Sequence, residues 1–587
     1  MKIQLRMSGL MAACLMMTLV MPMAARAQEE VSWVERSNEN SQILLLILAK
    51  WAPEAGTELG LPGLDEEISQ LPPDLVERVV ADFEEARKEL SARLDAERDP
   101  AVRLDLNILL HATDLILDEI RLEDQYLVGY ETVPEDIWRG IRILLDEQVD
   151  PSRRPAAVVR LNRYVGLEEG YTPLIDQHIA LLTTRLGDEE LLRPVKEELE
   201  GDLAKSGPFI GGLAPLFEQY GLEGWEPGME ALEAQIEKWD EFVRAEILPQ
   251  ARTDFRLPPD LYAFKLKDRG VDMPVEELVS RAKVAFVEIQ NEAQVLARLI
   301  AAERGFESSD YRDVIRELKK EQVSGDQAIE LFRLRIEEIE EIVRQHDLVT
   351  LPERDLIIRL ASEAESAAVS APHMNPPRML GNTGERGEFV VPLKNISAEG
   401  DLMSDDFTFD AASWTLTVHE GRPGHEMQFA GMVESGVSIA RLLFALNSTN
   451  AEGWALYTEA VMKPFMPLEG QLISLQHRLL RAARAFLDPG LQSGEVTPEE
   501  AMRILREDVV FSEAMALQEV ERYTFESPGQ ATSYFCGYSR LLELRADVER
   551  IQDDSFDQKA FHDFILAQGV LPPALIRKAV MEEFVGQ

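Results

Sequence analysis

Apolar residues recur every three or four positions through most of the chain, and this spacing limits the possible folds more than any other feature. From about residue 38 to residue 370 they alternate with Glu, Arg and Lys, as in Leu75 to Leu94, Arg103 to Glu119 and Ile329 to Val343. Such spacing gives each helix an apolar stripe that must be buried against a neighbour. No repeat of fixed length accompanies it, which disfavours a solenoid. We predict a mainly α-helical protein with a large helical body.

The pattern changes between residues 371 and 418, where proline and glycine become frequent. Glu388 to Leu393 is rich in β-branched residues and Phe, and Thr415 to Val418 is also strand-like. We therefore predict a small β-sheet here, followed by helices to Phe584. An edge strand would offer unpaired backbone groups to an extended peptide.

The first 27 residues have the pattern of a secretory signal peptide. Lys2 and Arg6 precede an apolar run from Leu10 to Met23, and the small residues Ala25 and Ala27 follow it. We predict cleavage after Ala27 and export to the periplasm or the medium; the alternative is a lipoprotein signal with the lipid on Cys14. The run is too short to span a membrane, and no later stretch reaches the required ~20 apolar residues, so we predict no transmembrane segment.

Charge and composition narrow the classes of partner. The chain has 60 basic and 106 acidic residues, which disfavours binding to nucleic acid or to an anionic membrane. It lacks a G-x-S-x-G motif and a phosphate-binding glycine loop, which argues against serine hydrolases and nucleotide enzymes. We predict an N-terminal helical lobe at residues 28–270 and a catalytic lobe at residues 271–587, or one continuous fold. The sequence leaves the oligomeric state open.

Two histidines lie close together, in the segment H-E-G-R-P-G-H that runs from His419 to His425. It begins like the zinc-peptidase motif H-E-x-x-H, but the second histidine is six positions after the first. At ~100° per residue, the two side chains would point about 120° apart on an ideal helix. Proline cannot donate to the helix ladder and glycine accepts unusual dihedral angles. We therefore expect Pro423 and Gly424 to interrupt the helix so that both histidines face one metal.

A glutamate 27 residues beyond His425 completes a possible ligand set. Catalytic zinc takes three protein ligands and leaves one position for water, and two histidines with one carboxylate are a common set. We predict that His419, His425 and Glu452 bind one zinc ion and that Glu420 is the general base. Glu459 shares a helix face with Glu452 and would fix a ligand histidine, unless both glutamates face solvent.

Several ordered motifs carry a resemblance to a known family. They are H-E-G-R-P-G-H followed by Gln428, E-G-W-A-L-Y-T-E at residues 452–459, P-G-Q-A at residues 528–531 followed by Tyr534, R-G-E-F-V-V at residues 386–391, L-R-A-A-R at residues 480–484 and L-L-E-L-R at residues 541–545. Together they resemble the bacterial family called domain of unknown function 885, from about Pro376 to Arg545. The resemblance implies a mostly helical body with a zincin-like site in a deep cleft, related to metallopeptidases. This chain departs from the family pattern at Glu426, Gln492 and Phe535.

The resemblance also suggests residues that would contact the substrate. Tyr534 matches a family tyrosine and would donate to the oxyanion, unless it is only a packed aromatic. Gln530 and Arg545 are candidate substrate-binding residues, although Arg545 would alternatively pair with Glu543 or Asp547 on its own helix.

We predict an exported zinc hydrolase, a metallopeptidase that acts on a peptide or another small amide, with an ester also open. The alternative is an exported binding protein that keeps the fold but catalyses nothing. The presence of Glu420 favours the enzyme, because a binding site for zinc needs no general base.

Overall fold

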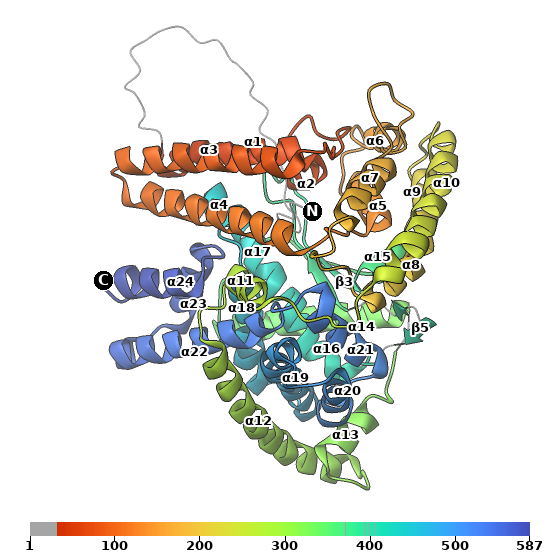
Figure 1. The fold of residues 1–587 in the computed structure, drawn as a ribbon. Helices are drawn as coiled ribbons and strands as arrows, with labels where there is room; N and C mark the ends of the chain where they lie inside the picture. Colours follow the sequence, from red (N-terminus) through yellow and green to blue (C-terminus); the bar gives the residue numbers. More distant parts are fainter. Residues whose placement is uncertain are drawn as a thin grey trace.

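The computed structural model describes residues 32–586, apart from residues 324, 370, 393, 398–399 and 404 (Figure 1). Helices make up most of this part of the chain, which confirms the mainly α-helical class. The predicted signal peptide lies outside the described residues. Within them, no helix combines the length and the apolar character that crossing a membrane requires.

From residue 32 to residue 268, the named elements of the described chain are all helices. They are α1 (Trp33–Trp51), α2 (Pro53–Leu59), α3 (Leu75–Ala96), α4 (Pro100–Tyr126), α5 (Val133–Arg142), α6 (Ala156–Tyr164), α7 (Leu174–Leu186), α8 (Lys196–Gly211), α9 (Leu213–Gln219), α10 (Glu226–Phe242), the π-helix η1 (Val243–Ile247), the 3-10 helix η2 (Leu248–Gln250) and α11 (Pro259–Asp268).

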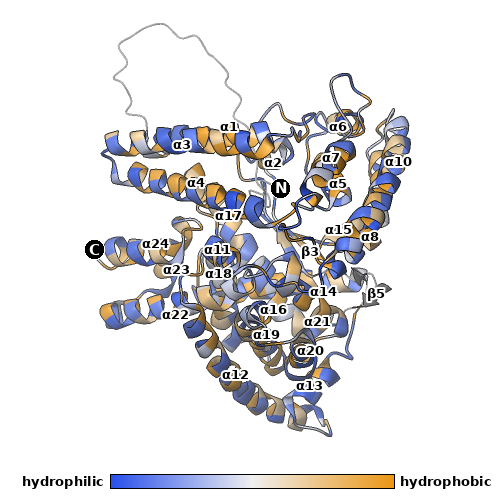
Figure 2. Ribbon diagram, in the orientation of Figure 1, coloured by the Kyte–Doolittle hydropathy of each residue, from blue (hydrophilic) through white to orange (hydrophobic). Residues whose placement is uncertain are grey.

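The apolar spacing places these helices as predicted. In α3, Leu75, Val79 and Phe83 recur at four-residue intervals and are buried against α1 and α4. α4 begins after Asp99, whose carboxylate accepts a hydrogen bond from the backbone N–H of Ala101. Polar and apolar bands therefore alternate along these peripheral helices (Figure 2).

The second half of the chain contains the longest described helix, α12, and supplies the candidate site. Its elements are α12 (Val275–Arg304), α13 (Tyr311–Leu318), α14 (Asp326–Gln345), α15 (Glu363–Ala368), α16 (Asp410–Leu416), the π-helix η3 (Thr417–Gly421), α17 (His425–Ser435), η4 (Ala440–Phe444), α18 (Ser448–Met462), η5 (Lys463–Phe465), α19 (Leu468–Ser493), α20 (Pro498–Arg503), η6 (Ile504–Asp508), α21 (Glu513–Glu521), η7 (Arg522–Glu526), α22 (Thr532–Gln552), η8 (Asp553–Ser555), α23 (Gln558–Ala567), α24 (Pro573–Ala579) and η9 (Val580–Phe584).

A small sheet interrupts these helices. Its strands β1 (Ile357–Leu360), β2 (His373–Asn375) and β3 (Glu388–Val391) have the order β1-β3-β2, with β1 parallel and β2 antiparallel to β3. In the register, Ile357 lies opposite Glu388 and Met374 opposite Phe389. A separate hairpin is formed by β4 (Lys394–Ser397) and β5 (Gly400–Met403).

The sheet confirms one predicted strand and shows that another was wrong. β3 covers most of the predicted segment from Glu388 to Leu393, and its three apolar residues are fully buried. Thr415 to Val418 is helical instead, at the junction of α16 and η3. Every residue from Ala411 to Gly421 is buried. A helix buried on all sides has no polar face, so its sequence loses the period that distinguishes it from a buried strand.

Three clusters of buried apolar residues organise the helices. One joins α1, α3 and α4 to α17, α18 and α22–α24, a second joins α12, α13, α16 and α19 to β3, and the third lies among α5–α10. The first contains residues from both sides of the predicted boundary at residue 270, which falls between α11 and α12; the division into lobes stays a prediction. Leu416 belongs to the second cluster and Val418 to the first, so η3 lies where these two cores meet.

Candidate metal centre

The histidine motif is interrupted where the sequence predicts. η3 ends at Gly421, a turn covers residues 422–424, and α17 begins at His425. The turn requires glycine at position 424, because a Cβ there would lie 2.1 Å from the carbonyl oxygen of His419. Trp454 of α18 donates a hydrogen bond of 2.9 Å from Nε1 to the carbonyl oxygen of Pro423. This bond connects the turn to the neighbouring helix.

Replacing glycine by alanine should have opposite effects on stability at two positions: Gly424, which directly precedes α17, and Gly431, which lies inside it. Gly424→Ala should lower the free energy of unfolding by about 1–3 kcal/mol, because a methyl group must displace backbone atoms. The matched control is Gly431→Ala, since a Cβ on Gly431 meets nothing within 4 Å and alanine favours a helix by ~0.5–1 kcal/mol. Urea unfolding of both variants measures the difference. Equal stability of the two would contradict the proposed role of the turn.

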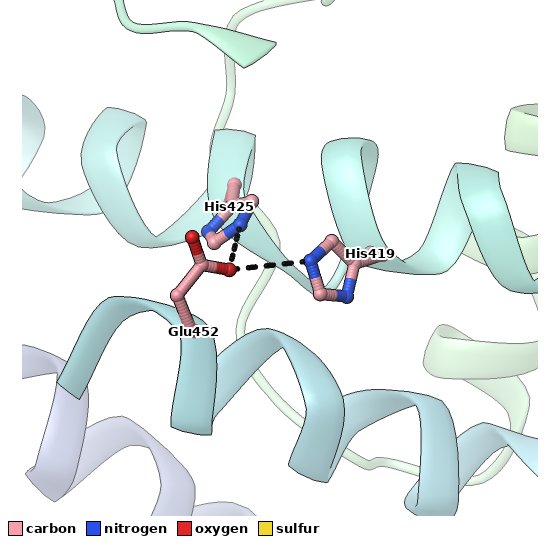
Figure 3. Close-up of side chains that lie close together, drawn as sticks. All are labelled: His419, His425 and Glu452. Atoms are coloured by element: carbon pink, nitrogen blue, oxygen red, sulfur yellow. Dashed lines mark hydrogen bonds and ion pairs between the residues drawn. The ribbon is translucent and has the colours of Figure 1, made fainter. Parts of the chain in front are cut away.

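His419, His425 and Glu452 converge in space (Figure 3). Glu452, from α18, points between the two imidazole rings, and its Oε2 lies 3.5 Å from Nε2 of His419 and 3.2 Å from Nε2 of His425. The rings are nearly perpendicular, with centroids 4.7 Å apart. His419 is almost fully buried, whereas 11% of the side-chain surface of His425 and 16% of that of Glu452 are exposed. Solvent therefore reaches the cluster from the side of His425 and Glu452.

The donor set fits a zinc ion. In a tetrahedral site with ligand distances of ~2.0–2.2 Å, neighbouring ligand atoms lie roughly 3.4 Å apart. The two separations from Glu452 Oε2 are close to that value, and one ligand atom from each of the three residues lies within 4.8 Å of the others. Among the described residues, this is the one group of His, Cys, Asp and Glu side chains with such geometry.

A buried carboxylate orients the first histidine. Glu459 Oε1 lies 2.7 Å from Nδ1 of His419, and Glu459 Oε2 accepts a hydrogen bond of 2.7 Å from the hydroxyl of Thr415. Glu459 is fully buried, so it does not face solvent. A histidine that donates from Nδ1 presents the lone pair of Nε2, here toward Glu452.

The charges of the cluster favour a cation. Burial alone would lower the pKa of His419, but hydrogen bonds with Glu452 and Glu459 and the charge of Glu420 raise it to about 9. Burial alone would raise the pKa of Glu452, but the charge of His425 and hydrogen bonds with both histidines hold it well below its usual value. Three carboxylates around two imidazoles thus make a buried site whose negative charge favours the binding of a cation.

Glu420 lies beside this cluster without joining it. Its Oε1 is 4.0 Å from Nε2 of His419, farther than Glu452, and burial raises the pKa of its carboxyl group. A carboxylate with a raised pKa that lies beside a metal site is suited to accept a proton.

Tyr534 of α22 lies beside His419. Its ring is nearly parallel to the imidazole, with centroids 6.3 Å apart, and burial raises the pKa of its hydroxyl. α22 reaches this position because it crosses α18 at two glycines. A Cβ on Gly453 would lie 2.6 Å from the carbonyl carbon of Gly537, and a Cβ on Gly537 would lie 1.9 Å from the carbonyl oxygen of Thr449.

The two predicted substrate-binding residues have partners outside the three proposed ligands. The amide of Gln530 donates a hydrogen bond of 3.1 Å to Ser448. Arg545 donates to the hydroxyl of Tyr457, to Glu549 and to Gln558, so its guanidinium group is already occupied. Its acidic partner is Glu549, whereas Glu543 and Asp547 pair with other arginines.

The three departures from the family pattern have structural partners. Glu426 is fully buried and accepts a hydrogen bond of 2.7 Å from Arg422. Gln492 accepts from the backbone N–H of Leu257 and donates to the carbonyl oxygens of residues 523 and 524. Phe535 packs in the second apolar cluster. In the described part of the chain, no side-chain hydrogen bond or ion pair joins them to the three proposed ligands.

Sequence reasoning missed Arg481 as a member of the site. It lies on α19 with only 7% of its surface exposed, and its guanidinium carbon is 5.0 Å from the ring centroid of Tyr534. The positive charge of Arg481 acts to lower the pKa of Glu420 and of Glu459, so it lies near both. The available signal was the spacing of His477, Arg481 and Arg484, which puts three basic residues on one face of α19.

A cavity of about 820 Å³ lies away from the cluster. It is lined by residues of α4, α8, α11 and η7, including Glu123, Asp202 and Lys265, and none of the three proposed ligands borders it. A deep cleft at the metal centre therefore stays a prediction.

Comparisons with known proteins agree with the fold. Two solved structures are similar along their whole length: a "putative lipoprotein of unknown function" from Shewanella oneidensis (21% identity, TM-score 0.68, covering 94% of this chain and 100% of that one) and a "putative lipoprotein" from Colwellia psychrerythraea (18% identity, TM-score 0.72, covering 95% and 100%). No protein with a curated description matches the sequence. The family model described as bacterial protein of unknown function (DUF885) matches residues 53–580. The chain therefore belongs to the DUF885 family.

Proposed function

We propose that this protein is a zinc-dependent hydrolase of the metallopeptidase type. The observation that supports the proposal most directly is the convergence of His419, His425 and Glu452, with a second carboxylate, that of Glu420, beside them. A structural zinc site uses all four positions for protein ligands, whereas a catalytic site has three and keeps a proton acceptor nearby.

Each residue has a task in this chemistry. His419, His425 and Glu452 would hold the metal, and Glu459 would keep His419 in the tautomer that ligates through Nε2. When bound, zinc lowers the pKa of a coordinated water and polarises a carbonyl group. Glu420 accepts the proton that the attacking water releases, and then donates it to the leaving amine. Tyr534 is the candidate donor to the developing oxyanion.

The sheet beside the site favours a peptide as substrate. In the order β1-β3-β2, the strand β2 is at an edge, and it packs against η3 and α17, which carry the two histidines. An edge strand can pair with an extended peptide through its free backbone groups. A peptide paired there would pass close to the candidate metal ligands.

Metal analysis combined with a peptide library tests the proposal. We expect about one zinc per chain in the purified protein, and cleavage of members of a mixed peptide library, read by mass spectrometry, that a chelator abolishes and added zinc restores. A protein that binds no zinc and cleaves nothing would instead favour the exported binding protein. Zinc binding without cleavage of peptides would direct the search to other amides and to esters.

We also propose that the chain is exported. The proposal rests on the leader, with cleavage after Ala27. The two similar structures are described as lipoproteins, so the test includes the alternative of a lipid on Cys14. The intact mass of protein exported by its native host distinguishes a chain that begins at Gln28 from a diacylated chain that begins at Cys14.

A further inference from the structure

The side chain of Arg481 is buried beside the candidate metal centre without an acidic partner. Its Nε is enclosed and makes no hydrogen bond, and within the described part of the chain the side chain forms no ion pair or hydrogen bond. Its neighbours are the ring of Tyr534, 5.0 Å from the guanidinium carbon, and the candidate base Glu420, whose pKa its charge lowers. Burying an unpaired guanidinium costs free energy unless a ligand supplies the missing charge.

The next arginine on the same face of α19 shows how such a group is normally satisfied. Arg484 donates from Nε and a terminal nitrogen to the two carboxylate oxygens of Glu519, which also accepts from Tyr523. Arg522 lies 3.4 Å from the same carboxylate. Two arginines thus share one acid at this place, and Arg481 has none.

The acids near Arg481 are bonded to other groups. Arg484 and Arg522 share Glu519. Glu459 is bonded to His419 and to Thr415. A carboxylate from the substrate would supply the partner that Arg481 lacks, because the planar fork of an arginine binds a carboxylate through two parallel hydrogen bonds.

We propose that Arg481 binds the free C-terminal carboxylate of a peptide, which makes the protein a carboxypeptidase. This inference rests on the proposed function and adds the substrate class. A carboxylate held by Arg481 places the last residues of the peptide between that arginine and the metal ligands, near Tyr534. The bond that is hydrolysed is then close to the C-terminus, and the products are a shortened peptide and a short C-terminal fragment.

Binding of matched peptides tests the inference without relying on turnover. The probes are three tetrapeptides. Two consist of alanine and leucine, one with a free C-terminal carboxylate and one with a C-terminal amide. The third is a C-terminal amide in which glutamate replaces the last residue. Calorimetric titration uses the full chain with Glu420→Gln, so that the peptide is not consumed. We expect the free acid to bind about 10- to 100-fold more tightly than either amide, as for a charge-assisted bond at a buried group.

Substitutions on α19 test whether Arg481 causes the preference for the free-acid peptide over its amide. Arg481→Met should reduce the ratio between acid and amide to about 1, and Arg481→Lys should restore it only in part, because an ammonium group lacks the fork. Arg478→Met is the matched control, since Arg478 lies one turn earlier over Tyr538 and should keep the full preference.

Three results would overturn the inference. The first is equal affinity for the free-acid peptide and its C-terminal amide, the second is a preference for the free acid that survives in Arg481→Met, and the third is an affinity for the glutamate amide equal to that for the free acid. The first and the third need only the chain with intact Arg481, so they remain informative even where Arg481→Met does not fold. Absence of zinc and of cleavage, with the preference for the acid intact, would contradict the proposed hydrolase and leave carboxylate recognition standing.

Discussion

Glu420→Gln should slow peptide hydrolysis by about 10²–10⁴-fold while zinc content and melting temperature stay nearly unchanged. Glutamine keeps the volume of the side chain but cannot accept a proton. Glu420 Oε1 lies 4.0 Å from Nε2 of His419, and the carboxylate is separate from the three candidate ligands, so its replacement leaves the donor set complete. Activity assays beside metal analysis of the same preparation measure both quantities.

Glu434→Gln is a suitable control for that variant. Glu434 is near the end of α17, where it forms a partly exposed ion pair with Arg354. Such pairs contribute only ~0–1 kcal/mol, so this variant should keep both zinc and activity. Near-full activity in Glu420→Gln would exclude the proposed base.

His419→Ala should abolish zinc binding and activity together. The bound metal stabilises the folded protein by about 2.7 kcal/mol when free zinc is at 100 times the dissociation constant. A chelator should therefore lower the melting temperature of the wild-type protein and leave that of His419→Ala unchanged. Differential scanning calorimetry with and without chelator measures this effect.

His562→Ala controls for the loss of a buried histidine. The ring of His562 lies 2.7 Å from the hydroxyl of Tyr457 and is outside the proposed ligand set. We expect lower stability with zinc binding and the response to chelator retained. If His419→Ala still binds zinc with wild-type affinity, the three residues do not form the metal site.

The peripheral helices were predictable because each buries one side only. The residues of α3 and α4 that face the core follow the helical period, and the polar residues between them remain outside. The sheet order could not be predicted, and neither could the pairing of β1 with β3. That pairing places Ile357 opposite Glu388, and no local sequence pattern specifies which distant segment a strand will pair with.

The candidate ligands could be picked out from the sequence because the pattern that marks them is local. Histidines six positions apart, with proline and glycine between them, pointed to an interrupted helix, which the structure shows between η3 and α17. Gln530 and Arg545 could not be assigned in this way, because their partners Ser448 and Tyr457 are about 80 to 90 residues away in sequence. Arg481 escaped notice for a related reason: the lack of an acidic partner is a property of the folded chain.

The crossing of α18 and α22 limits how this site can change. Glu452 immediately precedes Gly453, and Tyr534 lies three residues, about one turn, before Gly537, so a contact between two backbones sets the separation of both side chains. Mutations at these glycines can only push the helices apart and disturb ligand and tyrosine together. Substitutions in the surrounding loops or in α19 would therefore reshape the site of this protein, while the crossing keeps the separation between Glu452 and Tyr534 fixed.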